Sequence, residues 1–236
     1  MAGARLRPVA ALTVALQSRR RVGLLGGSFN PAHGGHRRIS LFSQQALGLD
    51  EVWWLVSPSN PLKDRHDMAP LHARFASAKE QARRAPIRVT AIEREFGTRF
   101  TIDTLCALQR RWPKLEFVWL MGGDNLAQFH QWRDWRGIAR LMPIAVIARP
   151  GYVRHALASP ARAWLRRYRI AAASMRKPGK WSAPALVLLR FDPDKRSATL
   201  LRRNEPDWAS RFSTGYQRDD LTHRLIPAAT DFGDQR

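Results

Sequence analysis

Short apolar runs alternate with stretches of helical periodicity along most of this chain. A run of about four to eight apolar residues bounded by turn signals is typical of a buried strand, and apolar residues spaced three or four apart indicate a helix. Six such runs lie at residues 22–25, 51–56, 87–91, 115–121, 144–148 and 184–191, and helices are predicted at 39–47, 70–84 and 101–111. Strands separated by helices predict an α/β fold, with a Rossmann-like, doubly wound, mainly parallel sheet in a single domain.

The glycine-rich turn after the first strand, residues 26–36, predicts a phosphate site. Its sequence is GGSFNPAHGGH, and the first predicted helix follows it. Glycine lets backbone N–H groups approach phosphate oxygens with no Cβ in the way, and the helix adds the positive end of its dipole. His33 and His36 would face the same anion. We therefore predict that this turn holds a nucleotide polyphosphate, although the sequence contains neither the Walker nor the dinucleotide-binding pattern.

Several polar residues come directly after predicted strands. They are His33, Lys63, Asp124 and Arg149. Because parallel sheets bind ligands beyond the carboxyl ends of their strands, a single crevice is expected to hold all of them. Lys63 lies on a loop stiffened by prolines, where it is either a point charge for phosphate or a solvated loop lysine. Asp124 can accept hydrogen bonds from ribose hydroxyls, and Arg149 can fork onto a phosphate.

The charge of the chain is strongly basic. Its formal net charge is +21, and no acidic residue lies between Trp135 and Phe191. Such a field attracts polyanions. An arginine-rich composition with a solvated basic face explains it at least as well as a nucleic-acid site, because the aromatic residues in this stretch form no recognisable stacking platform. A nucleic-acid partner is therefore not expected.

The single cysteine, Cys106, excludes an internal disulfide framework and fits a reducing compartment. No apolar run is long enough to span a membrane. We therefore expect a cytoplasmic protein with no membrane partner. Residues 1–20 predict a basic N-terminal extension, either unstructured or the product of a start codon placed too far upstream, and residues 204–236 predict a C-terminal tail of uncertain order.

Residues 26–36 also resemble the opening motif G-G-[ST]-F-[DN]-P-x-H-x-G-H of the H-x-G-H nucleotidyltransferases, and more narrowly that of bacterial nicotinate-nucleotide adenylyltransferases. Asn30 stands where many members have aspartate. The resemblance implies a nucleotidyltransferase domain over residues 21–203. Further matching segments are P-x-K at 61–63, [YF]-T-[IV]-x-T at 100–104, G-x-D with F-x-x-W-x-x-W at 122–135, R-P-G at 149–151, and I-S-S-T-x-[IL]-R at 196–202.

The last of these segments departs from the family pattern at Arg196 and Ala198. A rival placement at residues 212–218 fits worse, because a glycine interrupts it and no predicted strand precedes it. In the preferred placement, Ser197 and Thr199 would cap a helix whose N-terminus faces the β- and γ-phosphates of ATP, and Arg202 would add charge.

The resemblance implies an enzyme of NAD biosynthesis that transfers AMP from ATP to nicotinate mononucleotide, giving nicotinate adenine dinucleotide and pyrophosphate. Because no nucleophile is poised beside a base, direct in-line attack is expected, aided by positioning and electrostatics. Mg²⁺ would travel with ATP rather than occupy a dedicated protein site. The implied catalytic residues are His33, His36, Lys63 and Arg202. The implied ATP-binding residues are Gly26, Gly27, Ser28, Phe29, His33, His36, Gly122, Asp124, Ser197, Thr199 and Arg202.

For the acceptor, the resemblance implies contacts from Asn30, Lys63, Thr101, Trp132 and Arg149. Thr101 would receive the nicotinate carboxylate at a helix N-terminus, where a threonine is also commonly the N-cap. Trp132 would stack on the pyridine ring. The neighbouring Trp135 is predicted to pack in the core instead.

Two alternatives stay open. One is a related nucleotidyltransferase for another phosphorylated acceptor, such as nicotinamide mononucleotide or pantetheine phosphate, or one that uses CTP. The other is a basic nucleic-acid-binding protein with a vestigial pocket. The pairing of Thr101 with Trp132 favours the nicotinate enzyme. The preference for nicotinate over nicotinamide and the oligomeric state, with a homo-oligomer among the options, stay open as well.

Overall fold

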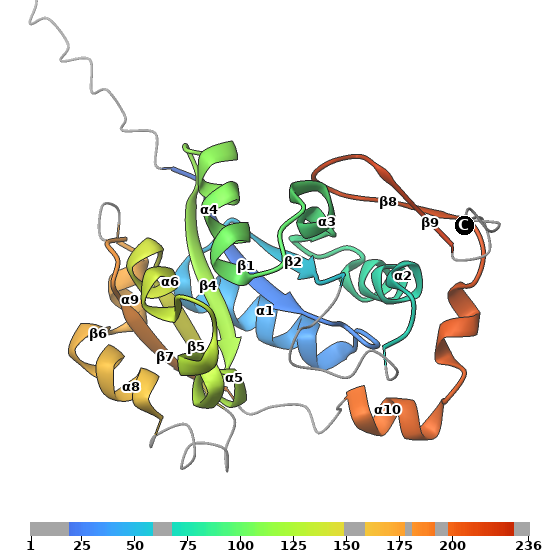
Figure 1. The fold of residues 1–236 in the computed structure, drawn as a ribbon. Coiled ribbons are helices and arrows are strands. Elements are labelled where there is room, and N and C mark those ends of the chain that lie inside the picture. The colour runs from blue at the N-terminus through green and yellow to red at the C-terminus, as the bar shows by residue number, and fades with distance from the viewer. Residues whose placement is uncertain (1–18, 59–67, 149–158, 178–180, 192–197, 229–236) are drawn as a thin grey trace, which may run out of the picture.

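A parallel sheet forms the centre of the protein (Figure 1). The computed structural model describes residues 19–58, 68–148, 159–177, 181–191 and 198–228. The sheet has seven strands in the order β3-β2-β1-β4-β5-β7-β6, and each neighbouring pair is parallel. Its strands are β1 (Arg21–Gly27), β2 (Glu51–Val56), β3 (Ile87–Thr90), β4 (Glu116–Gly122), β5 (Ile144–Ala148), β6 (Arg169–Ile170) and β7 (Leu186–Arg190).

Helices cover both faces of the sheet. One core cluster packs the first face against α3 (Ile92–Phe96), α4 (Thr101–Arg111), α5 (Gly123–Gln128), α6 (Trp135–Leu141) and α8 (Pro160–Leu165). The other packs the second face against α1 (Gly34–Leu47), α2 (Leu71–Ala82) and α9 (Ala172–Met175). Burial on both faces explains why the strands are near-continuous apolar runs; every residue of β2, for example, is buried.

The predicted α/β fold with a doubly wound sheet is confirmed. All six apolar runs form strands within a residue or two of the predicted bounds, and the three predicted helices correspond to α1, α2 and α4. The added strand, β6, has only two residues and no apolar run of its own. The strand order reverses between β1 and β4, and the crevice at that reversal is where ligands bind in such sheets.

The stretch after β7 is also built from regular elements. It contains α10 (Ala198–Asn204), the 3-10 turn η4 (Trp208–Phe212), and the antiparallel hairpin of β8 (Tyr216–Arg218) and β9 (Leu225–Pro227). The sequence left the order of residues 204–236 open, because no apolar periodicity marks these short elements. Figure 1 shows the stretch, in orange and red, running past α2.

No helix within the described ranges is both long and apolar enough to cross a membrane.

Candidate active site

The turn between β1 and α1 places two histidine rings at the start of a 14-residue helix. His33 is the N-cap of α1, and its Nδ1 accepts the backbone N–H of Gly35 at 3.1 Å. His36 Nδ1 accepts the backbone N–H of His33 at 3.2 Å. The ring centroids are 4.0 Å apart. Since each Nδ1 is an acceptor, the proton of each neutral ring resides on Nε2. Nε2–H is then the donor of each ring, and both rings lie at a helix start whose dipole favours an anion.

Phe29 supports this turn from the side of β2. Its ring is buried and lies 4.9 Å from the ring of His36 and 5.0 Å from that of Trp54, centroid to centroid. The turn predicted for phosphate is thus backed by aromatic packing against β2, which restricts where the His36 ring can point.

The structure gives a packing reason for Gly26. A Cβ at this position would lie 2.5 Å from Cη2 of Trp119. Trp119 is buried and belongs to β4, the strand that pairs with β1. Side chains essentially never approach that closely, so glycine is needed there for Trp119 to fit. The predicted close approach of the Gly26 and Gly27 backbone to phosphate stays a prediction, as does the ATP contact of Ser28.

Arg202 joins the turn from the other end of the chain. Its Nη1 donates to the backbone carbonyl of Asn30 at 2.7 Å, so α10 lies against the turn that carries the two histidines. The buried side chain of Asn30 accepts the backbone N–H of Ala69 at 3.2 Å, just before α2. The fold therefore brings together Arg202 and the opening motif, as predicted. Thr199 lies exposed on α10, and Ser197 falls outside the described residues.

Asp124 lies at the carboxyl end of β4, next to β1 in the sheet. Its carboxylate folds back over Gly122, where a Cβ would displace Oδ1. The Asp124 side chain is exposed to solvent, which suits a group that would accept ribose hydroxyls.

Two of the predicted acceptor residues, Thr101 and Trp132, lie on the α4 side of the sheet. Thr101 is the first residue of α4, but Phe100 occupies the N-cap with no side-chain cap bond, so the N-cap assignment for Thr101 is wrong. Its neighbour Thr104 makes the local bond instead, to the Thr98 hydroxyl at 2.7 Å. The N–H groups of Asp103 and Thr104 bond the Phe100 carbonyl, so an anion at this helix start would be received by the N–H groups of Thr101 and Ile102.

Trp132 is half-buried and stands edge-on to two aromatic rings, 6.2 Å from Trp119 and 5.4 Å from Phe129. The adjacent Arg133 places its guanidinium 4.6 Å above the Phe100 ring. This contact brings the Trp132 segment beside the start of α4, so the fold places Trp132 and Thr101 in one region. Trp135 is buried in the core, as predicted.

Lys63 and Arg149 lie outside the described residues, so their predicted phosphate contacts stay predictions. Within the described ranges, no three histidine, cysteine, aspartate or glutamate side chains gather as a metal site requires.

Arg74 is a residue of this region that the sequence reasoning missed. It is fully buried in α2 and donates to four backbone carbonyls: Ala69 at 2.8 Å, Ser28 at 2.8 Å, Ser57 at 2.7 Å and Pro58 at 3.1 Å. Burial lowers the pKa of its guanidinium to about 10, so it stays charged at neutral pH. It thus ties the opening turn to the end of β2. In the sequence, Arg74 is three residues after Leu71 and four before Ala78, and this helical spacing could have placed it on the core face of α2.

Glu93 is a second missed residue. Burial raises the pKa of its carboxyl to about 7, and a hydrogen bond with Ser57 partly offsets the rise. Glu93 and Arg74 therefore both bond to Ser57, at the point where β2 ends. No pattern in the sequence pointed to Glu93, since it lies in a five-residue helix with three charged residues.

Comparison with known proteins fits this geometry. A family model of cytidylyltransferase-like proteins matches residues 24–204. A protein of Erythrobacter litoralis named "Probable nicotinate-nucleotide adenylyltransferase" is 68% identical over 206 residues, which cover 87% of this chain and 94% of the relative. The chain belongs to the nicotinate-nucleotide adenylyltransferase family. As a member of that family it is a nucleotidyltransferase.

More distant members of the family agree. A Bradyrhizobium protein of the same name is 48% identical over 190 residues, covering 80% of this chain and 99% of the relative. The Plasmodium falciparum nicotinic acid mononucleotide adenylyltransferase, solved in complex with NaAD, superposes with a TM-score of 0.59 at 15% identity, over 78% of this chain and 83% of that one. At that identity the likeness shows the shared fold.

Proposed function

We propose that this adenylyltransferase transfers AMP from ATP to nicotinate mononucleotide, giving nicotinate adenine dinucleotide and pyrophosphate. The observation that carries the proposal is the histidine pair of the β1–α1 turn, whose Nδ1 atoms are both committed to backbone N–H groups. These bonds hold the neutral rings in one tautomer at the start of α1, where the α-phosphate would lie. Relatives with the nicotinate name support the acceptor.

The chemistry is a single displacement at phosphorus. An oxygen of the mononucleotide 5′-phosphate attacks the α-phosphorus of ATP, and the bond from that phosphorus to the α,β-bridging oxygen breaks as pyrophosphate leaves. Little covalent work falls to the protein, so catalysis comes from positioning and from stabilising the charge on the α-phosphate. His33 and His36 would supply Nε2–H donors to that charge.

The departing pyrophosphate would meet cations from two segments. Arg202 lies beside the histidine turn through its bond to Asn30, and its remaining guanidinium N–H groups can fork onto phosphate oxygens. Lys63, on the loop after β2, is proposed as the second cation. Asp124 would accept the ribose hydroxyls of ATP.

The acceptor ring would lie between the start of α4 and Trp132. The nicotinate carboxylate suits the N-terminal N–H groups of this 11-residue helix and the Thr101 hydroxyl. Trp132 would stack on the pyridine ring, while Asn30 and Arg149 would contact the mononucleotide phosphate side.

Mg²⁺ is proposed to enter as part of the ATP substrate. Magnesium keeps several waters and binds readily through substrate phosphates. The described residues offer single carboxylates such as Asp124 rather than a cluster, so phosphate oxygens would supply the metal's other ligands.

The setting of the enzyme is proposed from composition. One cysteine in the whole sequence fits the reducing cytoplasm. The substrates are small nucleotides, and neither a membrane nor a nucleic acid is needed as a partner. Sedimentation would decide whether a homo-oligomer forms.

Pyrophosphate release with a panel of acceptors tests the proposal. ATP with nicotinate mononucleotide should give the highest kcat/KM, above nicotinamide mononucleotide and pantetheine phosphate. A higher value with pantetheine phosphate would favour the related-transferase alternative. Salt-dependent binding of nonspecific RNA with no pyrophosphate release would favour the nucleic-acid alternative.

A further inference from the structure

The C-terminal strap, defined as residues 198–228, carries Arg202 to the site but is attached elsewhere. Its first element, α10, meets the opening turn through the bond from Arg202 Nη1 to the Asn30 carbonyl. From there the chain passes along α2 through η4 and ends in the β8–β9 hairpin (Figure 1). The position of Arg202 therefore depends on what holds the strap.

The far end of the strap is held by two carboxylates. Asp219 is buried and accepts from the Thr90 hydroxyl at 3.0 Å and from the Ala91 N–H at 2.7 Å, at the end of β3. Asp220 accepts from the Val89 N–H at 2.8 Å and pairs with Lys79 of α2 at 2.5 Å. These contacts fix the hairpin to β3 and α2.

Nearer the site, the strap is held by a buried histidine of α2. His72 is 3% exposed, and its Nδ1 lies 2.8 Å from the backbone carbonyl of Phe212, the last residue of η4. A carbonyl only accepts, so Nδ1 carries the proton and donates it. His72 Nε2 is buried and has no hydrogen-bond partner among the residues that the structure describes. The unsatisfied Nε2 acceptor lowers stability, while the Nδ1 bond to Phe212 holds the strap.

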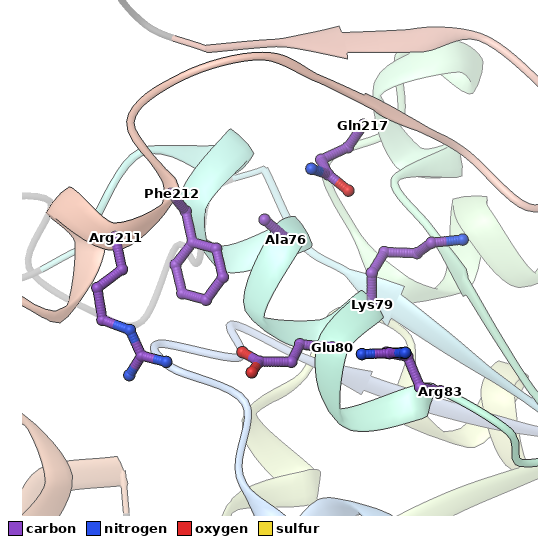
Figure 2. A pocket seen from close by; sticks show the side chains of 7 residues that line it. All are labelled: Ala76, Lys79, Glu80, Arg83, Arg211, Phe212 and Gln217. Atoms are coloured by element: carbon purple, nitrogen blue, oxygen red, sulfur yellow. The ribbon is translucent and has the colours of Figure 1, made fainter.

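The strap also packs on α2 through η4, whose Trp208 is buried. Beside this packing, a hollow of about 430 Å³ lies between the strap and α2 (Figure 2). It is lined by Ala76, Lys79, Glu80, Arg83, Arg211, Phe212 and Gln217. At the edge of the hollow, His72 adds a specific hydrogen bond to the last residue of η4.

We propose that His72 is a positioning residue, which sets the place of Arg202 at the ATP phosphates by holding η4. Three contacts form a closed circuit: Asn30 Oδ1 to the Ala69 N–H before α2, His72 of α2 to Phe212, and Arg202 back to the Asn30 carbonyl. Loss of the middle link would leave α10 attached to the opening turn through Arg202 but with less restraint from η4, so the position of Arg202 would be less well fixed. The inference rests on the proposed role of Arg202 in holding ATP phosphates.

The test compares His72→Leu with His72→Asn. Leucine removes the donor, whereas the asparagine amide places an N–H close to the position of Nδ1. We expect His72→Leu to raise KM for ATP about three- to tenfold, the worth of roughly one hydrogen bond, with KM for nicotinate mononucleotide unchanged. His72→Asn should restore the wild-type value. Asp207→Asn, an exposed change on the same strap, is the matched control.

A second readout is independent of catalysis. Backbone amide exchange in residues 198–204 should become faster in His72→Leu and stay near wild type in His72→Asn. In an Arg202→Ala background, His72→Leu should raise KM for ATP no further. If His72→Leu does not fold, Asp220→Asn at the partly exposed far anchor should show the same faster exchange.

Unchanged exchange in α10 with a lower Tm would overturn the inference and leave His72 a purely structural residue. The inference is equally overturned if the effect of His72→Leu on KM for ATP persists in full without Arg202. By contrast, an Arg202→Ala variant with wild-type KM for ATP, together with faster α10 exchange in His72→Leu, would overturn the proposed role of Arg202 and leave His72 as a strap anchor alone.

Discussion

At the scale of single residues, the histidine pair shows how backbone geometry prepares a side chain for chemistry. Each ring accepts a backbone N–H through Nδ1, which leaves Nε2 as the donor. A donor already aimed at developing charge loses little freedom when the substrate arrives. Nε2 of each ring is therefore the donor that we propose for the α-phosphate.

Replacing His36 by alanine removes one of these donors and the partner of the His33 N–H. We expect turnover to fall by roughly 10²–10³-fold, as for the loss of a donor to a charged transition state. Circular dichroism should show an intact fold. Turnover within a few-fold of wild type would contradict the role given to His36.

Gly26 makes a different residue-scale prediction. Gly26→Ala should lower the free energy of unfolding by about 1–3 kcal/mol, because the new Cβ would lie 2.5 Å from Trp119 Cη2. Urea denaturation measures the loss. The loss should shrink in a Trp119→Phe background, whose shorter ring lacks that atom, and an equal loss in both backgrounds would refute the steric cause.

Glu93 predicts a pH dependence of stability. Its pKa is raised to about 7 in the folded state, so the folded protein holds a proton that the unfolded chain releases near its ordinary value of 4.5. Stability should therefore fall as pH rises from about 4.5 to about 7 and stay level above that range.

Glu93→Gln cannot ionise and should lack this fall. Urea denaturation near pH 5 and pH 8 should show wild type losing up to about 3 kcal/mol more than the variant over that range. Parallel losses in the two proteins would show that Glu93 is ionised throughout.

At the scale of elements, the sequence predicted the buried strands and the helices that alternate with them. The six strands were found because parallel strands covered on both faces need unbroken apolar runs, as in β2 and β4. The parallel arrangement of the sheet followed from the alternation with helices. The short elements β6 and α3 were missed because neither has an apolar run or is long enough to show periodicity.

The candidate site was predicted only in part, for physical reasons. A turn proposed to bind phosphate through glycines and backbone N–H groups leaves a recognisable local sequence, so the turn at residues 26–36 could be predicted. Arg74 and His72 act through tertiary contacts with carbonyls that any residue could supply. The prediction of Thr101 as an N-cap was wrong. The preference of threonine for N-caps is weak, and Phe100, with an extended backbone, occupies the N-cap instead.

Arg74 gives the test at this scale. Arg74→Met would leave four buried carbonyls without their donor, and we expect a loss of roughly 2–4 kcal/mol in the free energy of unfolding. Arg83→Met, an exposed change just after the same helix, should cost less than about 0.5 kcal/mol. Similar values for the two variants would show that the carbonyls find other donors.

At the scale of the whole molecule, the crevice at the strand-order reversal collects residues from distant parts of the chain. The histidine turn follows β1, Asp124 follows β4, and Arg202 arrives on a strap attached to β3 and α2. The net charge of +21 would attract two anionic substrates over long range. One assembled crevice is thus expected to carry out one reaction.

Product analysis tests that expectation most directly. The purified protein is incubated with ATP, Mg²⁺ and nicotinate mononucleotide, and both products are quantified by chromatography. We predict nicotinate adenine dinucleotide and pyrophosphate in equal amounts, with both nearly abolished in a His33→Ala/His36→Ala variant. Pyrophosphate without the dinucleotide, or equal yields from the variant, would contradict the proposed reaction.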